Sequence, residues 1–533
     1  MTSSTIAMIA AFAIYLILMV VVGIFSSKGN DTASDFFLGG RKLGPWVTAL
    51  SAEASDSSAW LLMGLPGLCY LGGFKETLWT SLGLIVGTYL AWLFIAKNLR
   101  KCSITYGDSI TIPEFLTNRF NDKTHILSAI SVFFIVVFFT IYTASGFVAC
   151  AKLFRSVFGL QWGYGLAIGF VIILAYTIMG GYKAVCLTDF IQGTLIFVAF
   201  VFSAIVIILN LGGVTNAVSQ VQSFTDRALS GELGAEFMKN FTANKSYSPV
   251  SAISAFAWCL GYFGMPHIIV RFMGIRSNKE IKTARRIGIV WMIVSYVGTF
   301  IIGTLGTAFL FKNGILLGTD NVLEGVKALG ENGGIIQIVK GLGAGTQEAV
   351  FSESIKLMFP AFIAGLFLCA ILAASMSTAD SQLLAASSAV GQDIFKGLIK
   401  KDASDKTVLL VSRISVFAIA VIGLLLALNP DSSIFNLVSF AWSGFGATFG
   451  PLILLALYWK KATAAGAIAG LIAGGVTDVV WHYIPSSISP LFGIYEILPA
   501  FIVCLLVTIV VSLCTKKDPE VLAKFDQYKK MPD

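Results

Sequence analysis

Long apolar runs recur along the whole chain, and they decide what it can fold into. The first covers residues 6–25, and comparable runs follow as far as Leu513. A run of about 20 apolar residues crosses a bilayer as an α-helix, because lipid leaves the backbone no hydrogen-bonding partner except itself. The 533 residues are 56% hydrophobic and 12% charged, against roughly a quarter charged in soluble domains. The sequence therefore predicts an all-α integral membrane protein.

The apolar runs predict about thirteen transmembrane helices in a single domain that covers residues 1–533. An odd number of spans places the two termini on opposite sides of the membrane. The first run is too long for the apolar part of a signal peptide and follows no basic stretch, so we expect it to be a true span. The expected spans are 6–26, 46–71, 77–96, 126–154, 162–180, 185–211, 249–272, 286–311, 357–390, 408–428, 434–459, 464–484 and 494–514.

Lysine and arginine gather in alternate loops. Dense groups lie at 97–123, 271–286 (counting Arg271 at the membrane edge) and 396–413, and in the tail 515–533. Because cytoplasmic loops carry the excess of basic residues, we expect the N-terminus outside and the C-terminus in the cytoplasm of a plasma (inner) membrane. The net charge of +8 reflects this distribution and does not indicate nucleic-acid binding.

Two spans are interrupted by Gly-x-Pro at similar positions. Gly64 and Pro66 follow Trp60 in the second span, and Gly264 and Pro266 follow Trp258 in the seventh. Spans five apart run in opposite directions, as an inverted repeat requires. Matched Gly/Pro breaks in two halves mark the binding site of many transporters. The alternative is that both residues are simply common in membrane helices.

The second span also carries charge where lipid disfavours it. Asp56, with Glu53 one turn earlier, lies in the small, polar stretch 51–58. A charge at mid-membrane costs roughly 2.5–3.5 kcal/mol on insertion scales, so such residues face a protein interior or a water-filled path. A packed helix–helix seam would explain the serines and alanines. It would not explain two carboxylates, so we expect a functional break here.

The ninth span offers oxygen atoms to match. Ser377 and Thr378 carry hydroxyls, Ala374 lies one turn earlier, and Asp380 adds a carboxylate. Two carbonyls of the broken second span, the Ala374 carbonyl freed by a bend in the ninth span, and these two hydroxyls would make a five-oxygen Na⁺ site; a packing seam is again the alternative. Asp189 begins the sixth span, where it is either hydrated at the inner surface or part of an ion path.

Other chemistries lack support in the sequence. The eight cysteines form no CxxC pair and the three histidines are scattered, which argues against a zinc or haem site. No P-loop, HExxH or GxSxG motif is present, so neither ATP-driven transport nor an enzyme is expected. Aromatic residues near the two breaks could instead line a solute chamber: Trp60, Tyr142, Trp258 and Tyr262.

Across nearly its whole length the chain resembles the sodium/solute symporter family, most closely its sodium/proline symporter branch. Several separate motifs carry the resemblance in order along the chain. They are DFFLGGR at 35–41, ASDSSAWLLMGLPG at 54–67, FTIYTASG at 139–146, GYFGMPHIIVRF at 261–272, LAASMSTADSQLL at 372–384 and AWSGFGATFGP at 441–451.

The resemblance implies a leucine-transporter-like fold of two inverted five-helix repeats. The repeats would be 46–211 and 249–459, with an extra first helix at 1–26, two last helices within 464–514 and the tail 515–533.

The resemblance also implies site residues. The Na⁺ ligands would be the carbonyls of Ala54, Ser57 and Ala374 and the hydroxyls of Ser377 and Thr378. Asp56 and Asp189 would support them, and Asp380 and Ser381 with Asp189 could form a second Na⁺ site. The solute pocket would include Trp60, Gly64, Tyr142, Trp258, Tyr262 and Pro266.

The expected function is sodium-coupled import of a small amino acid, first of all L-proline, with Na⁺ as coupling ion and the lipid bilayer as surroundings. No nucleic acid and no obligate protein partner are expected. Met265 stands where glutamine is usual in the proline branch, so pantothenate, another carboxylate or a sugar remain alternative solutes. A membrane sensor with the same fold is a further alternative, although the short tail offers no signalling domain.

Overall fold

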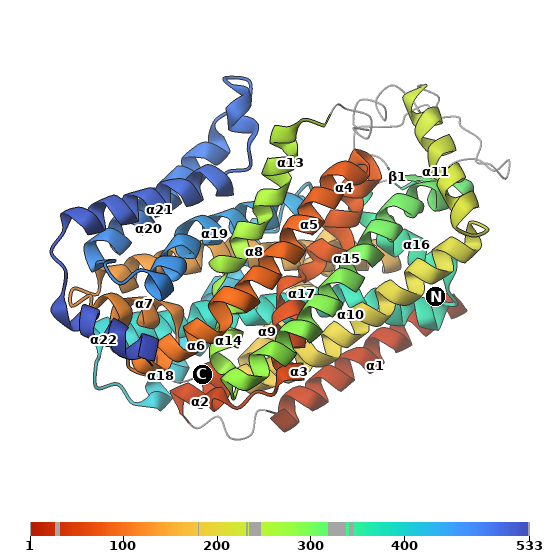
Figure 1. The fold of residues 1–533 in the computed structure, drawn as a ribbon. Coiled ribbons are helices and arrows are strands. Elements are labelled where there is room, and N and C mark those ends of the chain that lie inside the picture. The colour runs from red at the N-terminus through yellow and green to blue at the C-terminus, as the bar shows by residue number, and fades with distance from the viewer. Residues whose placement is uncertain are drawn as a thin grey trace.

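The computed structural model describes residues 2–26, 32–179, 181–230, 233, 247–317, 337–339 and 346–530. Over these residues the chain is almost entirely helical (Figure 1), as the apolar runs predict. The exception is one pair of parallel strands, β1 (Ile315–Leu317) and β2 (Gln337–Val339).

The helices of the N-terminal half are α1 (Ser3–Ser26), α2 (Ala33–Leu38), α3 (Pro45–Asp56), α4 (Leu65–Gly72), α5 (Phe74–Leu90), α6 (Ala96–Thr105), α7 (Ile112–Phe120), α8 (Ile126–Phe158), α9 (Trp162–Met179), α10 (Tyr182–Asn210) and α11 (Val214–Leu229). Those of the C-terminal half are α13 (Pro249–Phe256), α14 (Pro266–Gly274), α15 (Ile281–Lys312), α16 (Val350–Met358), α17 (Ala361–Ser388), α18 (Asp405–Leu426), α19 (Ile434–Tyr458), α20 (Ala464–Tyr483), α21 (Ile497–Cys514) and α22 (Pro519–Lys530). π-helical turns cover Trp60–Gly64, Ala91–Ile95 and Ala389–Ile399, and a 3₁₀ segment covers Ala257–Phe263.

Each of the thirteen expected spans coincides with helix. Within the described residues, ten helices are long and apolar enough to cross a membrane, and the bent pair α13–α14 raises the number to eleven. The other two expected spans, 46–71 and 162–180, contain shorter apolar helices. The all-helical membrane fold is therefore confirmed, while the count of thirteen stays a prediction.

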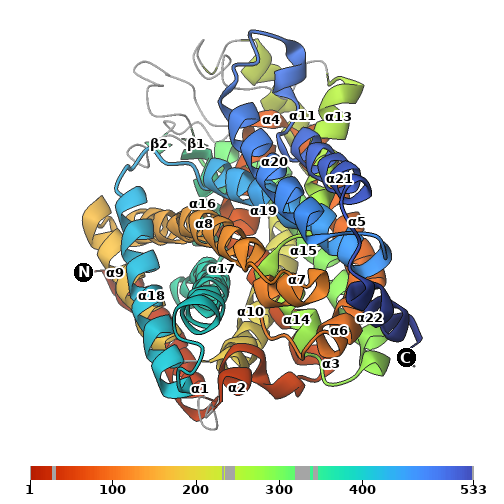
Figure 2. The ribbon, with the colours of Figure 1, turned by 90° about the vertical axis from the view of Figure 1, so that its left-hand side faces the viewer.

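Helix α17 lies at the centre of the bundle. Seen along its axis in Figure 2, it is surrounded by α8, α10, α1 and α18, and it packs on each of them. Nearly all its residues from Ala370 to Leu384 are buried. A helix that is buried on every side lies inside the protein and not at its surface. The polar stretch Ser377–Asp380 of α17 is therefore enclosed by protein.

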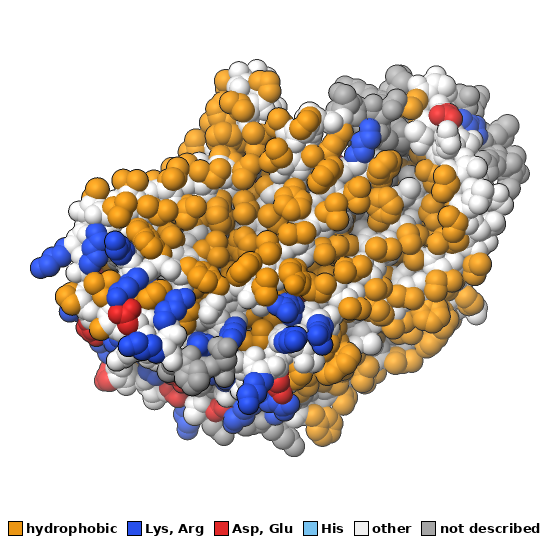
Figure 3. Space-filling view, viewed as in Figure 1, with side chains coloured by type: hydrophobic (Ala, Val, Ile, Leu, Met, Phe, Trp, Pro, Cys, Tyr) orange, Lys and Arg blue, Asp and Glu red, His pale blue; other side chains and the backbone are white. Residues whose placement is uncertain are grey.

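The outer surface shows where lipid contacts the bundle. Figure 3 shows hydrophobic side chains covering most of one face, while Lys and Arg gather along its lower edge. Large apolar side chains such as Ile17, Val297 and Ile414 are more than half exposed on α1, α15 and α18. Exposed apolar surface on this scale is unfavourable in water and favourable in a bilayer.

Small residues bring the last two long helices together. A Cβ added at Gly470 or Gly466 of α20 would overlap the hydroxyls of Thr508 or Ser512 on α21. Glycine at these positions lets the two backbones approach closely, which is how helices associate where lipid removes the hydrophobic driving force. The pair α20–α21 packs beside α19 and supports it from outside.

Candidate ion and solute site

The second span is broken where the sequence predicts. Helix α3 ends at Asp56, Ser57 is its C-cap, and Ser58 has a positive φ of 23°. A π-helical turn follows from Trp60 to Gly64, and α4 begins beyond it. Positive φ is uncommon for a residue with a side chain. The break therefore needs contacts from elsewhere to hold it.

Those contacts come from the groups that the break releases. The amide of Ser58 would normally donate to the carbonyl of Ala54; it donates to the Thr378 hydroxyl instead, at 3.1 Å. The Trp60 amide donates to the hydroxyl of Ser58, two residues earlier, at 3.1 Å. The carbonyl of Ala54 is thereby freed for another partner. Buried backbone groups are almost always paired, so the break and α17 stabilise each other.

The freed carbonyl points at α17. Ser377 Oγ lies 2.9 Å from the Ala54 oxygen and 3.2 Å from the Ala374 oxygen. All three residues are fully buried. The expected bend at Ala374 is absent, because α17 is a continuous helix from Ala361 to Ser388. Ser377 Oγ therefore joins the carbonyl released at the break to a carbonyl of its own helix, and Thr378, the next residue, contacts the Ser58 amide. Four of the five predicted ligand residues are brought together in this way.

The fifth, Ser57, lies at the break with a different set of contacts. Its hydroxyl donates to the Glu53 carbonyl at 2.6 Å. Its own carbonyl accepts from the Leu61 amide at 3.2 Å. In this state the Ser57 carbonyl belongs to the turn that leads into the π-helix.

The carboxylate of Asp56 is held by the seventh span. The Tyr262 hydroxyl donates to Asp56 Oδ2 in a short hydrogen bond, and the Tyr142 hydroxyl lies 3.5 Å from the Asp56 carbonyl oxygen. Tyrosine hydroxyls can satisfy a buried carboxylate without neutralising it. Asp56 is therefore both enclosed and oriented, next to the carbonyls rather than among them.

The seventh span is broken as well. Residues Ala257–Phe263 form a 3₁₀ segment, Met265 is extended, and α14 starts at Pro266. The two parts meet at 44°. Proline fits the first turn of α14 because it needs no amide there. The ring nitrogen His267 Nε2 lies 3.2 Å from the Ser55 carbonyl, which ties this break to the first one.

Aromatic rings pack together beside the two breaks. Trp60 and Trp258 stack with ring centroids 5.1 Å apart, and Phe435 packs against both. Gly64 faces the same cluster, since a Cβ there would lie 3.0 Å from the Trp60 ring. The indole nitrogen of Trp60 is buried without a partner. An unpaired buried donor among aromatic rings is a polar contact available to a ligand.

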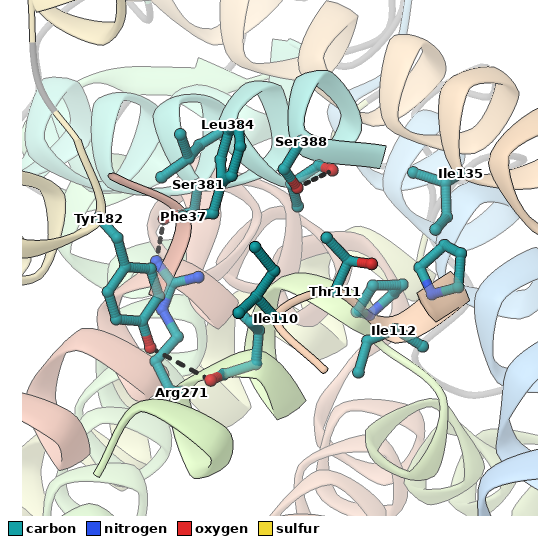
Figure 4. Close-up of a pocket in the computed structure, with 14 residues that line it drawn as sticks. Phe37, Ile110, Thr111, Ile112, Ile135, Tyr182, Arg271, Ser381, Leu384 and Ser388 are labelled. Atoms are coloured by element: carbon teal, nitrogen blue, oxygen red, sulfur yellow. Dashed lines mark hydrogen bonds between the residues drawn. The ribbon is translucent and has the colours of Figure 1, made fainter. Parts of the chain in front are cut away.

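Pro266 lines a small cavity. The cavity measures about 20 Å³ and is also lined by Val270, Arg271, Ser381 and Thr111; it is large enough for about one water molecule. Figure 4 shows Arg271 in this cavity with Tyr182 beside it and Ser381 above. The cavity therefore borders α17 at Ser381 and Ser388.

Arg271 holds the remaining predicted polar residues together. Its guanidinium, 1% exposed, lies 3.3 Å from Asp189 Oδ2 and 3.0 Å from Ser55 Oγ, and it donates to Ser381 Oγ in a short bond. Asp189 Oδ2 also accepts from Ser51 Oγ at 2.7 Å. Helices α3, α10, α14 and α17 all contribute to this cluster.

Asp380 lies at the edge of the same cluster. Its Oδ1 accepts from Ser381 Oγ at 3.2 Å. Its Oδ2 and the Oδ1 of Asp189 are buried without a partner. Burying a carboxylate oxygen without a hydrogen-bond partner costs free energy. These two oxygen atoms are therefore available to a ligand such as a cation.

Comparison with known proteins agrees with these features. Residues 36–474 match the sodium:solute symporter family. The chain belongs to this family. Within it, the symporter is 40% identical to the osmoregulated proline transporter OpuE of Bacillus subtilis (strain 168), over 96% of each chain. It is 41% identical to a sodium/proline symporter of Staphylococcus aureus (strain JH9), over 95% of this chain and 92% of the relative.

The symporter also shares its fold with a solved structure. A Na⁺-coupled sialic acid symporter, in a substrate-bound outward-open state, superposes with a TM-score of 0.72. The match covers 96% of this chain and 98% of the other at 21% identity, which supports the fold alone. The leucine-transporter-like fold expected from the sequence is confirmed.

Several residues of the site of this symporter carry little signal in the sequence. Arg271 reads as one of the charges at the membrane edge, although it falls inside an apolar run, where a basic residue is a functional candidate. Ser51 and Ser55 read only as part of a small, polar stretch. Phe435 gives no signal, because aromatic residues are common in membrane proteins.

Proposed function

We propose that this protein is a sodium-coupled symporter that imports a small amino acid, first of all L-proline, by alternating access. It is a transporter and not an enzyme. The contact of Ser377 Oγ with the Ala54 carbonyl, released at the break, and with the Ala374 carbonyl of α17 carries the proposal, because unwound carbonyls and nearby hydroxyls are the oxygen atoms with which broken membrane helices hold Na⁺. The proline transporters among its relatives support the choice of solute.

The proposed Na⁺ ligands are the carbonyls of Ala54, Ser57 and Ala374 and the hydroxyls of Ser377 and Thr378. In the present geometry the Ser377 and Thr378 hydroxyls have backbone partners. Binding of Na⁺ would exchange these partners for the ion and would turn the Ser57 carbonyl toward it. Asp56 supplies negative charge beside the ion and holds the break through Tyr262.

The proposed solute site lies among the aromatic residues beside the two breaks. Its residues are Trp60, Gly64, Tyr142, Trp258 and Tyr262. The pyrrolidine ring of proline would pack against the stacked indoles, since aromatic faces bury apolar groups well. The start of the π-helical turn lies next to the ion site and would face the solute carboxylate, because half-helix N-termini favour anions. Pro266 would contribute by fixing the start of α14.

Coupling follows from shared parts. The break between α3 and α4 provides both the carbonyls for Na⁺ and Trp60 for the solute, so ordering it for one ligand prepares it for the other. Moving one Na⁺ inward gains about 2.3 kcal/mol per 100 mV of membrane potential, which corresponds to roughly fifty-fold accumulation of a neutral solute.

The charge distribution supports an N-terminus outside and a C-terminus in the cytoplasm of a plasma membrane. In Figure 1 the N-terminal end of α1 and the C-terminal end lie at opposite ends of the bundle, as an odd number of spans requires. The repeats would be 46–211 and 249–459, flanked by 1–26, 464–514 and the tail 515–533.

Uptake by the purified protein in liposomes tests the proposal. Labelled proline should accumulate with an inward Na⁺ gradient, and an excess of unlabelled proline should compete. A panel with pantothenate, a monocarboxylate and a hexose tests the alternative solutes. Uptake unaffected by replacing Na⁺ with choline would refute sodium coupling. Competition by another solute, without competition by proline, would show that the site binds that solute instead.

A further inference from the structure

An apolar cavity lies between α1, α9 and the central helix α17. It has a volume of about 220 Å³, and every residue that lines it is apolar. The lining includes Met19 and Val20 of α1, Val171 and Ala175 of α9, and Met376 of α17. We propose that one acyl chain of a membrane phospholipid occupies this cavity and packs against α17, beside the proposed Na⁺ ligands.

The outer side of the cavity faces the bilayer. Val20, Ile24 and Val171 line it and are 47%, 46% and 61% exposed. The cavity lies toward the C-terminal ends of α1 and α9, which the proposed orientation places in the cytoplasmic half of the membrane. Hydrocarbon chains surround a membrane helix at this depth, so the phospholipids of that leaflet meet the opening.

The inner side of the cavity reaches the centre of the bundle. Met19 and Met376 line the cavity, yet their side chains are 0% and 1% exposed. Helix α1 packs closely on α17 and only sparsely on α9, so the two outer helices diverge and leave the space between them. An acyl chain that enters from the surface therefore ends against α17 and does not merely lie along the outside of the protein.

The chemistry of the lining selects the occupant. Protein interiors contain few voids larger than a water molecule, and an unfilled cavity leaves its walls without dispersion contacts. A buried water needs about two to four polar partners, which an apolar lining does not offer. A hydrocarbon chain supplies the missing contacts, and the bilayer provides it at the opening.

The inner wall of the cavity lies next to the proposed Na⁺ site. Met376 directly precedes Ser377 and Thr378, whose hydroxyls hold the break after α3. The Tyr15 hydroxyl donates to Met376 Sδ at 3.9 Å and accepts from Gln192 Nε2 at 3.1 Å. A methionine side chain is flexible and adapts to the space around it. The acyl chain thus supports Met376 from the lipid side, while Tyr15 holds it from α1.

A phospholipid with a photoactivatable diazirine on its acyl chain tests occupancy directly. Wild-type protein in liposomes that contain this lipid would be irradiated and digested, and mass spectrometry would locate the label. We expect label on Met19 and Met376, besides exposed residues such as Ile414 of α18 that any surrounding lipid reaches. Label on Ile414 without label on either methionine would overturn the proposal, whatever the protein transports.

Ala175→Phe closes the cavity from α9. Its ring should fill the space, so the label on Met376 should disappear while the label on Ile414 stays. Ile168→Phe is the matched control, because it adds the same ring to the same helix at a position that is 37% exposed and does not line the cavity. Val20→Phe fills the cavity from α1 and replaces Ala175→Phe if that variant fails to fold. Equal labelling of Met376 in filled and control variants would contradict occupancy.

The link to Na⁺ is measured as proline uptake in two kinds of liposome, and this arm rests on the proposed function. Methyl-branched phytanoyl chains fit the cavity poorly, whereas oleoyl chains are unbranched. With phytanoyl lipids, the Na⁺ concentration for half-maximal uptake should rise roughly five-fold or more in wild type and Ile168→Phe. Ala175→Phe should give the same value in both lipids.

Two outcomes of the uptake experiment would overturn the link between the acyl chain and α17. One is no shift in wild type, and the other is a shift of equal size in all three proteins, which is the sign of a general membrane effect. Uptake that needs no Na⁺ in oleoyl lipids would instead refute the proposed function and leave occupancy of the cavity to the labelling result.

Discussion

Ser377 Oγ lies 2.9 Å from the carbonyl oxygen of Ala54, a residue 323 positions earlier in the chain. This contact joins the central helix α17 to the break after α3. It exists because the amide of Ser58 has turned to Thr378, which leaves the Ala54 carbonyl without its helical partner. One hydroxyl pair on α17 thus both stabilises the break and faces the carbonyls that the break exposes.

Ser377→Ala should weaken Na⁺ binding. The change removes the hydroxyl that lies between the Ala54 and Ala374 carbonyls. Loss of one oxygen ligand costs about 1–3 kcal/mol, so the Na⁺ concentration for half-maximal uptake should rise by roughly 5- to 150-fold, with a smaller effect on the proline KM at saturating Na⁺. Ser375→Ala is the matched control, because Ser375 Oγ donates to the Ile371 carbonyl of its own helix. Equal Na⁺ dependence in both variants would remove Ser377 from the site.

Thr378→Val should loosen the break itself. Valine has nearly the shape of threonine but offers no acceptor, so the Ser58 amide would be buried without a partner. We expect a loss of about 1–3 kcal/mol in stability, seen as a lower melting temperature in detergent, and a weaker dependence of uptake on Na⁺. Thr378→Ser keeps the acceptor and should remain close to wild type. A Val variant as stable and as Na⁺-dependent as the Ser variant would argue against this contact.

Asp56→Asn should separate charge from shape. Asparagine keeps the size of the side chain and a hydrogen bond with the Tyr262 hydroxyl, but it removes the negative charge beside the proposed ion. Hydrogen bonds to charged groups contribute about 1.5–3 kcal/mol, so Na⁺-driven uptake should fall by at least roughly ten-fold. Tyr262→Phe keeps the charge and loses only the hydrogen bond, so it should retain more Na⁺ dependence. The reverse order of the two variants would contradict the role given to Asp56.

Trp258→Ala should affect the solute more than the ion. Trp258 stacks on Trp60 and also lies 5.1 Å from the Tyr495 ring. Aromatic pairs contribute about 0.5–1.5 kcal/mol beyond their buried area, so the proline KM should rise about ten-fold or more while the Na⁺ dependence is kept. Trp258→Phe should lie between Ala and wild type. An unchanged proline KM in the Ala variant would place the solute elsewhere.

Gly261→Ala tests how closely the second break packs. A Cβ at this position would overlap the indole nitrogen of Trp442, and that nitrogen donates to the Trp258 carbonyl at 2.8 Å. Overpacking costs typically about 1–3 kcal/mol, so melting temperature and proline binding should both fall. Gly163→Ala is the control, since nothing lies within 4 Å of a Cβ there. Equal stability of the two variants would contradict the packing described.

The broken helices were predictable because their cause is local. Serine, alanine and glycine with a carboxylate interrupt an apolar run at 51–58, and Gly-x-Pro interrupts two spans, so residue types alone mark both places. Ser377 and Thr378 were predictable for another reason, since their hydroxyls stand out in an apolar run, whereas the bend expected at Ala374 is absent because α17 is continuous.

The partners of those breaks were less predictable, because they depend on tertiary packing. Arg271 reads as one more positive charge near a membrane edge until α14 folds it against Asp189. Phe435 lies far along the chain from Trp60 and meets it only when α19 crosses the break. Pro266 lines a small cavity beside Arg271, and its place in the solute pocket stays a prediction.

Proline accumulation driven by a Na⁺ gradient alone tests the central claim most directly. Liposomes containing wild-type protein, and others containing the Ser377→Ala/Thr378→Ala double variant, would be given equal inward gradients of Na⁺ or choline. The account predicts accumulation above the external concentration only for wild type with Na⁺. Equal accumulation with choline, or full Na⁺-driven accumulation in the double variant, would contradict a sodium site between the broken helix and α17.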